Sequence, residues 1–373
     1  MNCPASPSQH LSGKAWHLTI LIGALAIVSC SPETKNPTLV KFTGPTMGTA
    51  YSVKIRKLAA RLNQEDLQGG IEQVLKRIND RMSTYLEDSE LSRFNKQQTT
   101  DWMEVSPDTI AVISEAIRTS RLTEGAFDVT VGPLVDLWGF GRVPRGDTIP
   151  SDTEIREALQ KVGYTKIHTR ISPPAIKKDR PDIQIDLSAI AKGYAVDQVA
   201  DYLDRSQVLD YLVEIGGELR AKGKNAQGTA WTVGIEKPVS NKRVIHQVLQ
   251  LKDRAMATSG DYRNYFEENG RRFSHTIHPR SGRPIRHPLA SVTVISSSSM
   301  HADAMATALN VMGPVVGYKL AEREKIAALF IIRGADGFQD RATSEFVQVT
   351  SGDGSRPSRT SGPRGESRGK GAK

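Results

Sequence analysis

The sequence predicts an α+β protein with a mainly antiparallel sheet, and two observations carry that prediction. Segments with helical spacing and segments with strand character are grouped along the chain, which argues against a doubly wound parallel sheet. After residue 204 the chain holds short strand-like runs separated by turns rich in Gly, Asn and Pro. With 373 residues, the chain is long enough for a large core and two subdomains.

The first half begins with a strand and continues mainly as helices. Residues 42–55 end in alternating apolar and polar positions, which predicts one strand. Apolar residues at helical spacing predict a helix over residues 63–82. They are Leu67, Ile71, Val74, Leu75, Ile78 and Met82. Ser106 followed by Pro107 predicts the start of a second helix, because proline is favoured at the first helical position.

Two further helices are predicted before residue 204. Ser151 and Glu154 have the spacing of a capping box, and Gly163 can end the helix that it opens. Residues 183–203 predict a short strand that runs directly into a helix.

The second half is predicted to form strands around one more helix. The segments with strand character are 209–223, 230–238, 244–252, 288–295, 327–333 and 345–350. Residues 300–309, "MHADAMATAL", predict a helix, with the serines at 296–299 as its cap.

The composition suits a soluble globular protein, with 38% hydrophobic and 24% charged residues. The net charge of +9 could indicate an anionic partner, but residues 351–373 contain six Lys or Arg, one Asp and one Glu. Because this tail has no apolar anchor, we expect it to be disordered. The remainder is only mildly basic, so no nucleic-acid partner is expected.

The N-terminus resembles the signal of a bacterial lipoprotein. Residues 18–29 are apolar but too short to span a membrane, Lys14 precedes them, and Cys30 follows in the lipobox-like run "IVSC". This predicts a signal peptide over residues 1–29, a lipid on Cys30, a tether over residues 30–40, and a membrane-anchored protein facing the periplasm. The alternative is an ordinary secretory signal with a chance cysteine.

Cysteine content limits the chemistry of the mature domain. The only cysteines are Cys3 and Cys30, and the predicted processing removes the first and acylates the second. Any metal ion must then be held by oxygen or histidine ligands, which favours a hard cation such as Mg²⁺.

Two glycine-containing stretches have the character of binding segments. Residues 123–141 place Asp128 among glycines and aromatic residues, which suits close approach to a ligand or a compact packed loop. Residues 186–197 run from Asp186, at the predicted strand end, into a helix start with Lys192 and Gly193. A helix start can bind a phosphate; the alternative is an ordinary helix whose lysine faces solvent.

Two other stretches carry candidate catalytic or metal-binding groups. His275 and His278 precede a Pro-Arg-Ser-Gly turn, so either could be a general base or simply part of a hairpin. On the predicted helix, Asp303, Thr307 and Asn310 share one stripe, which suits either a metal site or a polar face. Asp303 in the first turn would also be favourable beside the helix dipole.

Taken in order, eight motifs resemble the FAD:protein FMN transferase family, called ApbE, over about residues 40–350. They are "MGT" (47–49), "STYLEDSELSRFN" (83–95), "GAFDVTVGPLVDLWGFG" (125–141), "DLSAIAKGYAVD" (186–197), "EIGGE" (214–218), "TSGDY" (258–262), "SHTIHPRSGRP" (274–284) and "HADAMATAL" (301–309).

The resemblance implies a T-fold-related α+β catalytic domain over residues 41–350, with an FAD cleft between two halves. It implies an enzyme that cleaves the pyrophosphate of FAD, attaches FMN to a Thr or Ser of an exported or membrane redox protein, and releases AMP. Two alternatives stay open: a non-catalytic FAD-binding lipoprotein, and an FAD pyrophosphatase in which water replaces the acceptor.

The resemblance also implies roles for particular residues. The Mg²⁺ ligands correspond to the backbone carbonyl of Ala189 and the side chains of Asp303 and Thr307. His275 corresponds to the histidine that activates the acceptor hydroxyl, and many family members have Asp at the position of His278. The residues that correspond to FAD contacts are Met47, Tyr85, Ala126, Phe127, Asp128, Asp186, Lys192 and Ile277.

Overall fold

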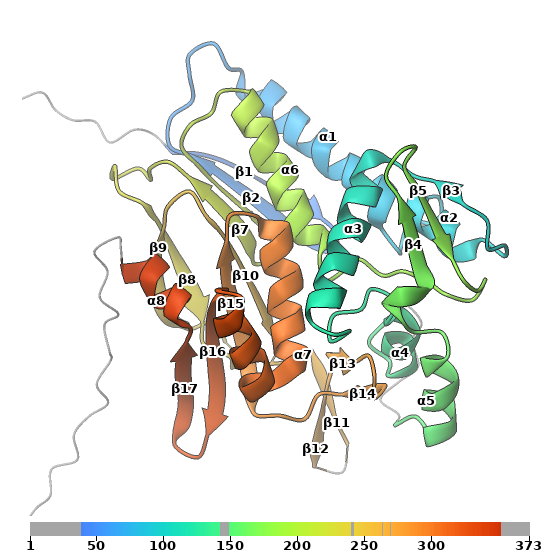
Figure 1. Ribbon diagram of the computed structural model, residues 1–373. Helices are drawn as coiled ribbons and strands as arrows, with labels where there is room; N and C mark the ends of the chain where they lie inside the picture. The colour runs from blue at the N-terminus through green and yellow to red at the C-terminus, as the bar shows by residue number, and fades with distance from the viewer. Residues whose placement is uncertain (1–38, 142–148, 240–241, 263, 269, 352–373) are drawn as a thin grey trace, which may run out of the picture. The chain divides into compact units, whose positions relative to one another are not determined.

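A central antiparallel sheet organises the protein, seen in a computed structural model that describes residues 39–141, 149–239 and 242–351, apart from 263 and 269 (Figure 1). The sheet has eight strands, and every hydrogen-bonded pair in it is antiparallel. In spatial order they are β1 (Val40–Thr46), β2 (Thr49–Ile55), β6 (Tyr211–Ile215), β7 (Glu218–Lys222), β10 (Ala255–Gly260), β15 (Leu289–Ser296), β16 (Ala327–Gly334) and β17 (Gly337–Ala342). The predicted fold class is therefore confirmed.

Long helices cover one face of this sheet (Figure 1). They are α1 (Gln64–Met82), α3 (Pro107–Leu122), α6 (Ala191–Arg205) and α7 (Ser299–Arg323). The first three share a core cluster with β1, β2 and β6, while α7 packs on β10, β15 and β16. The six apolar residues that predict α1 are all buried, so its amphipathic pattern is confirmed.

The opposite face is covered by a hairpin and a short helix. These are β8 (Trp231–Glu236), β9 (Ile245–Leu251) and α8 (Ser344–Ser351). Trp231, Val233 and Ile235 point inward at every second position of β8 and join the cluster on this face. Both faces of the sheet are thus packed, which gives the strands a firm base for the loops at their ends.

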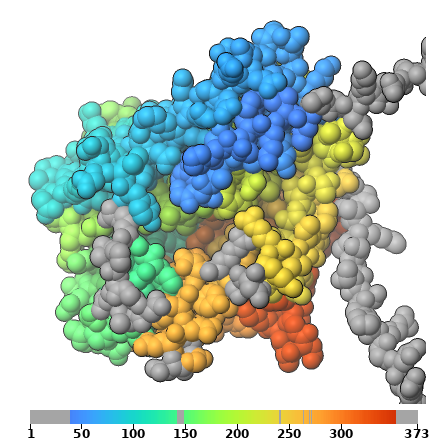
Figure 2. All heavy atoms as spheres, turned by 180° about the vertical axis from the view of Figure 1, so that it is seen from behind, coloured from blue at the N-terminus to red at the C-terminus, as the bar shows by residue number. Residues whose placement is uncertain are grey.

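The remaining elements are short. They are α2 (Glu90–Lys96), β3 (Met103–Glu104), α4 (Gly132–Leu137), α5 (Asp152–Leu159), a 3₁₀ turn (Tyr164–Lys166), β4 (Ile167–Arg170), β5 (Ala175–Lys178), β11 (Tyr265–Glu268), β12 (Arg271–Ser274), β13 (Ile277–His278) and β14 (Arg283–Pro284). Seen from behind, the surface runs from the blue residues of β1, β2 and α1 at the top to the orange residues of β11–β14 at the bottom (Figure 2).

Some predicted segments lie outside the described residues. The signal peptide over residues 1–29, most of the tether over 30–40 and the tail from 352 belong to them. Across the ranges that the structure does describe, no helix combines the length and the apolar character needed to cross a membrane.

Three predictions about the first half were wrong in detail. Residues 42–55 form a hairpin instead of one strand, because Met47 (φ 47°) and Gly48 (φ 71°) make a two-residue turn. Residues 183–186 form no hydrogen-bonded strand, and α6 begins at Ala191 instead of directly after Asp186. Gly163 does not end a helix, since α5 ends at Leu159.

Two predictions about the second half were also wrong. Residues 345–350 belong to α8, because Thr343 caps this helix by accepting from the Phe346 N–H and Phe346 packs into the core. Local strand propensity is overridden there by tertiary packing. Asp303 does not lie in the first turn of α7, which begins at Ser299 and has no acidic residue in that turn.

Candidate active site

A cavity of about 450 Å³ gathers nearly all of the predicted site residues. They belong to the loops after α1 and α3, the segment before α6, α6 itself, the β12–β13 connection, β13 and α7. Those that line it are Tyr85, Ala126, Phe127, Asp128, Asp186, Ala189, Lys192, His275, Ile277, Asp303 and Thr307. Segments far apart in sequence therefore meet in one place, as the ordered motifs imply.

Met47 is the predicted site residue that does not line this cavity. It occupies the β1–β2 turn in the left-handed region and lies partly buried against the main core cluster. A non-glycine residue in that region is strained, and such strain is often found near functional sites. Its assignment to FAD contact stays a prediction.

The cavity contains a buried group of opposite charges. The Lys192 Nζ lies 3.3 Å from Glu218 Oε1 and 3.7 Å from Asp303 Oδ2. The Gly193 N–H donates to Asp303 Oδ2 at 3.1 Å. Burial alone would lower the pKa of Lys192, but the two carboxylates outweigh it and raise that pKa, so the side chain is an ammonium.

Glu218 is a site residue that the sequence did not single out. It begins β7, directly after Gly216 (φ 63°) and Gly217 (φ 110°), and is 4% exposed. Burial raises the pKa of Glu218 to about 8. Lys192 opposes this rise, and the Asp303 carboxylate adds to it. The available signal was an acidic residue directly after a glycine pair in "EIGGE".

The donor atoms fit a hard cation. Asp303 is buried, and burial raises its pKa although Lys192 and the Gly193 N–H oppose that shift. Thr307 lies one helical turn further along α7, and Ala189 lines the same cavity. Among the described residues, no group of three or more His, Cys, Asp or Glu is placed to hold a metal. Mg²⁺ commonly takes only a few oxygen ligands from the protein, because phosphate and water oxygens complete its coordination shell.

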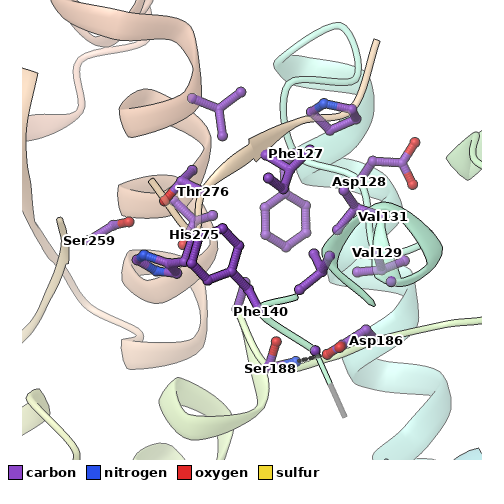
Figure 3. A pocket seen from close by; sticks show the side chains of 18 of the residues that line it. Phe127, Asp128, Val129, Val131, Phe140, Asp186, Ser188, Ser259, His275 and Thr276 are labelled. Carbon is purple, nitrogen blue, oxygen red and sulfur yellow. Dashed lines mark hydrogen bonds between the residues drawn. The ribbon is translucent and has the colours of Figure 1, made fainter. Parts of the chain in front are cut away.

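The segment before α6 is held by hydrogen bonds from a side chain and from neighbouring backbone. The Asn95 side chain accepts from the Ile185 N–H and donates to the Ile185 carbonyl, both at 2.8 Å. The Asp186 N–H donates to the Val129 carbonyl at 2.7 Å, and Asp186 Oδ1 accepts from the Ser188 N–H at 2.8 Å (Figure 3). These bonds hold the backbone that leads to Ala189, although the segment pairs with no strand that the structure describes. The prediction of a strand here was therefore wrong.

His275 lies in the cavity wall in a defined tautomer. Its Nδ1 is 2.9 Å from the Asn264 carbonyl oxygen, which can only accept, so Nδ1 carries the proton and Nε2 is free of one. The ring meets Phe140 edge-on, with 6.3 Å between centroids (Figure 3). Burial lowers the pKa of His275, so the neutral form prevails at pH 7.

His278 has different surroundings. It does not line the cavity, and its Nδ1 accepts from the Arg280 N–H at 3.2 Å. Burial lowers the pKa of His278 as well. Of the two histidines, only His275 faces the space where the other predicted residues converge.

Asp128 shapes the wall of the cavity from within its loop. Its carboxylate accepts from the Thr130 N–H at 2.8 Å, the Thr130 hydroxyl at 2.6 Å and the Tyr164 N–H at 2.8 Å. Figure 3 shows this carboxylate pointing away from Phe140 and His275. Burial raises the pKa of Asp128 although the three donors oppose it. Direct contact of its side chain with FAD stays a prediction.

The fold and this cavity define a protein of the flavin transferase class. The structure matches a flavin transferase ApbE from Vibrio cholerae with a TM-score of 0.78 and 44% identity, covering 83% of this chain and 99% of that one. It matches the apo form of a flavinyl transferase ApbE from Pseudomonas stutzeri with a TM-score of 0.77 and 39% identity, covering 84% and 97%.

Sequence comparison agrees over nearly the whole length. A curated FAD:protein FMN transferase of Haemophilus influenzae is 45% identical over 332 residues, which cover 88% of this chain and 95% of that protein. The model of the ApbE family matches residues 47–330. The chain belongs to the ApbE family.

Proposed function

We propose that this protein is an FAD:protein FMN transferase. The observation that carries the proposal is that one cavity brings the neutral His275 together with the buried Lys192–Asp303 pair. A base for a hydroxyl group and a cation beside a carboxylate are what phosphoryl-type transfer from a nucleotide requires. The relatives that carry this name match over most of their length, which supports the same activity here.

The proposed reaction uses these residues for alignment and charge. Lys192 shares the negative charge of the FAD pyrophosphate. The acceptor Thr or Ser oxygen bonds to the phosphorus of the FMN half, and the bond from that phosphorus to the bridging oxygen breaks. AMP leaves with the bridging oxygen, and the hydroxyl proton goes to Nε2 of His275.

We assign the Mg²⁺ site to the carbonyl of Ala189, the carboxylate of Asp303 and the hydroxyl of Thr307. When bound, the ion supplies neutralisation of phosphate charge. The support is the all-oxygen donor set and the cation already held by Asp303, namely the Lys192 ammonium.

We further propose that the protein is exported, anchored by a lipid on Cys30 and directed at an exported or membrane redox protein. The support is the lipobox-like sequence alone. In bacterial cells fed an alkyne fatty acid, the protein should become labelled, and Cys30→Ala should abolish the label. Equal labelling of the variant would rule out this anchor.

The activity is tested by measuring AMP from FAD and Mg²⁺, with and without an acceptor domain bearing the flavinylation motif. A transferase releases AMP mainly when the acceptor is present. Equal release without acceptor identifies an FAD pyrophosphatase, and binding of FAD without any AMP identifies a non-catalytic flavin carrier. Asp303→Ala should lose the metal-dependent turnover; unchanged turnover would contradict the metal assignment.

A further inference from the structure

The proposed metal ligands are divided between two helices. Ala189 lies directly before α6, whereas Asp303 and Thr307 lie on α7. A slide or rotation of one helix against the other would therefore change the distances between the ligands. Metal sites need ligand positions held to within roughly 0.5 Å, so the contact between these helices matters for affinity.

Backbone contact brings the two helices together at Gly193. A Cβ at this position would lie 2.3 Å from the Ser299 carbonyl oxygen and 2.8 Å from the Asp303 Cβ. Such close approach explains the glycine near the start of α6. It also places the first turn of α7 directly against α6.

One turn further along α6, Asp197 caps the N-terminus of α7 from outside that helix. Its Oδ2 accepts from the Ser298 hydroxyl at 2.8 Å and the Met300 N–H at 3.0 Å. Its Oδ1 accepts from the Ser299 N–H at 3.0 Å and from Arg220 at 2.9 Å. The residue is 8% exposed, so these bonds are largely shielded from water.

The charge of Asp197 supplies what α7 lacks. The first turn of α7 contains no acidic residue, and its own N-cap, Ser298, accepts from the His301 N–H. Free N–H groups and the helix dipole favour a negative charge at this end. Asp197 provides it from α6, one turn from the Gly193 contact and on the same face of the helix.

We propose that Asp197 is a positioning residue that sets the register of α6 against α7 and thereby the geometry of the Mg²⁺ site. The inference rests on the proposed function, since it takes the metal ligands from there. Asp197 acts through the helices, since it does not line the cavity itself. Loss of its charge should weaken metal binding more than it weakens the fold.

The test is Mn²⁺ binding to the full-length protein in the presence of ADP, measured by electron paramagnetic resonance without any turnover. We expect Asp197→Asn to raise the dissociation constant about tenfold, the range seen when groups that orient metal ligands are changed. Saturating Mg²⁺ should then restore the transferase rate of this variant. Asp201→Asn is the matched control, because Asp201 also faces Arg220, at 3.7 Å, one turn further along α6.

An unchanged dissociation constant for Asp197→Asn, or an equal rise for Asp201→Asn, would overturn the inference. If Asp197→Asn does not fold, Ser298→Ala removes one donor to the same carboxylate and should raise the dissociation constant about two- to fivefold; no rise would overturn it equally. Failure of the unchanged protein to bind Mn²⁺ would overturn the proposed metal site, and this inference with it.

Discussion

At the residue scale, neighbouring charges and a backbone carbonyl determine how the side chains of the cavity are held: Lys192 lies between Glu218 and Asp303, and His275 bonds to the Asn264 carbonyl. Asp303, Lys192 and His275 line one cavity, as the family resemblance implies. The motif "EIGGE" contains Glu218, but its burial beside Lys192 depends on the β6–β7 turn and could not be read from the motif alone. Nor could the sequence show that the Asp128 carboxylate is engaged within its own loop.

The lowered pKa of His275 makes the rate of flavin transfer depend on pH. The base is neutral above its pKa, so the rate should rise with pH through a midpoint below 6.5, the ordinary value, and stay high above it. His275→Ala should lower the rate by about 100-fold or more and remove this acidic limb.

The matched control is His278→Ala, at the histidine that lies outside the cavity. It should keep both the rate and the midpoint of the unchanged protein. A loss of rate confined to His278→Ala would exchange the two assignments.

At the element scale, amphipathic helices were predictable because the spacing of apolar residues along the sequence indicates which face is buried. The buried stripe of α1 is such a case. The type of element was predicted wrongly where long-range contacts determine it. One example is α8, whose Phe346 packs on the sheet. The segment before α6 is a second example, because the Asn95 side chain makes the backbone hydrogen bonds that a neighbouring strand would otherwise make.

The close contact of α6 and α7 predicts the effect of a single methyl group. Gly193→Ala should lower the free energy of unfolding by about 1–3 kcal/mol, because its Cβ meets backbone that cannot easily move. Gly69→Ala, in α1, is the control, since nothing lies within 4 Å of its Cβ.

The control should raise the free energy of unfolding by about 0.5–1 kcal/mol through helix propensity. Urea denaturation of the three proteins measures both effects. Equal changes in the two variants would show that α6 and α7 are not in the described contact.

At the scale of the whole molecule, the sheet class was predictable from the grouping of elements, while the order of its strands was not. Placing β10 between β7 and β15 requires pairings across long stretches of chain. The sequence of a single segment does not indicate which distant strand it pairs with.

A link between α3 and α7 predicts how global stability depends on acid. Burial would raise the pKa of Glu115, but His301, at 2.9 Å, and Arg118 outweigh it and lower that pKa from 4.5 to about 2. A carboxyl group whose pKa is lowered by folding stabilises the folded state at every pH above its pKa in the unfolded chain. That stability is lost as pH falls from about 4.5 towards 2.

Glu115→Gln should therefore cost about 1 kcal/mol of unfolding free energy at pH 7, allowing for solvent screening, and nothing near pH 2. Urea unfolding at both pH values measures the difference. A cost that is the same at both would show that the ionised form is not the stabilising one.

We propose above all that this cavity transfers FMN from FAD to a protein hydroxyl group. The most direct measurement is the intact mass of an acceptor domain after incubation with the protein, FAD and Mg²⁺. We expect a gain of one FMN less one water on a Thr or Ser, with one AMP released per adduct. No mass gain on any acceptor tested, while FAD is bound or hydrolysed, would contradict it.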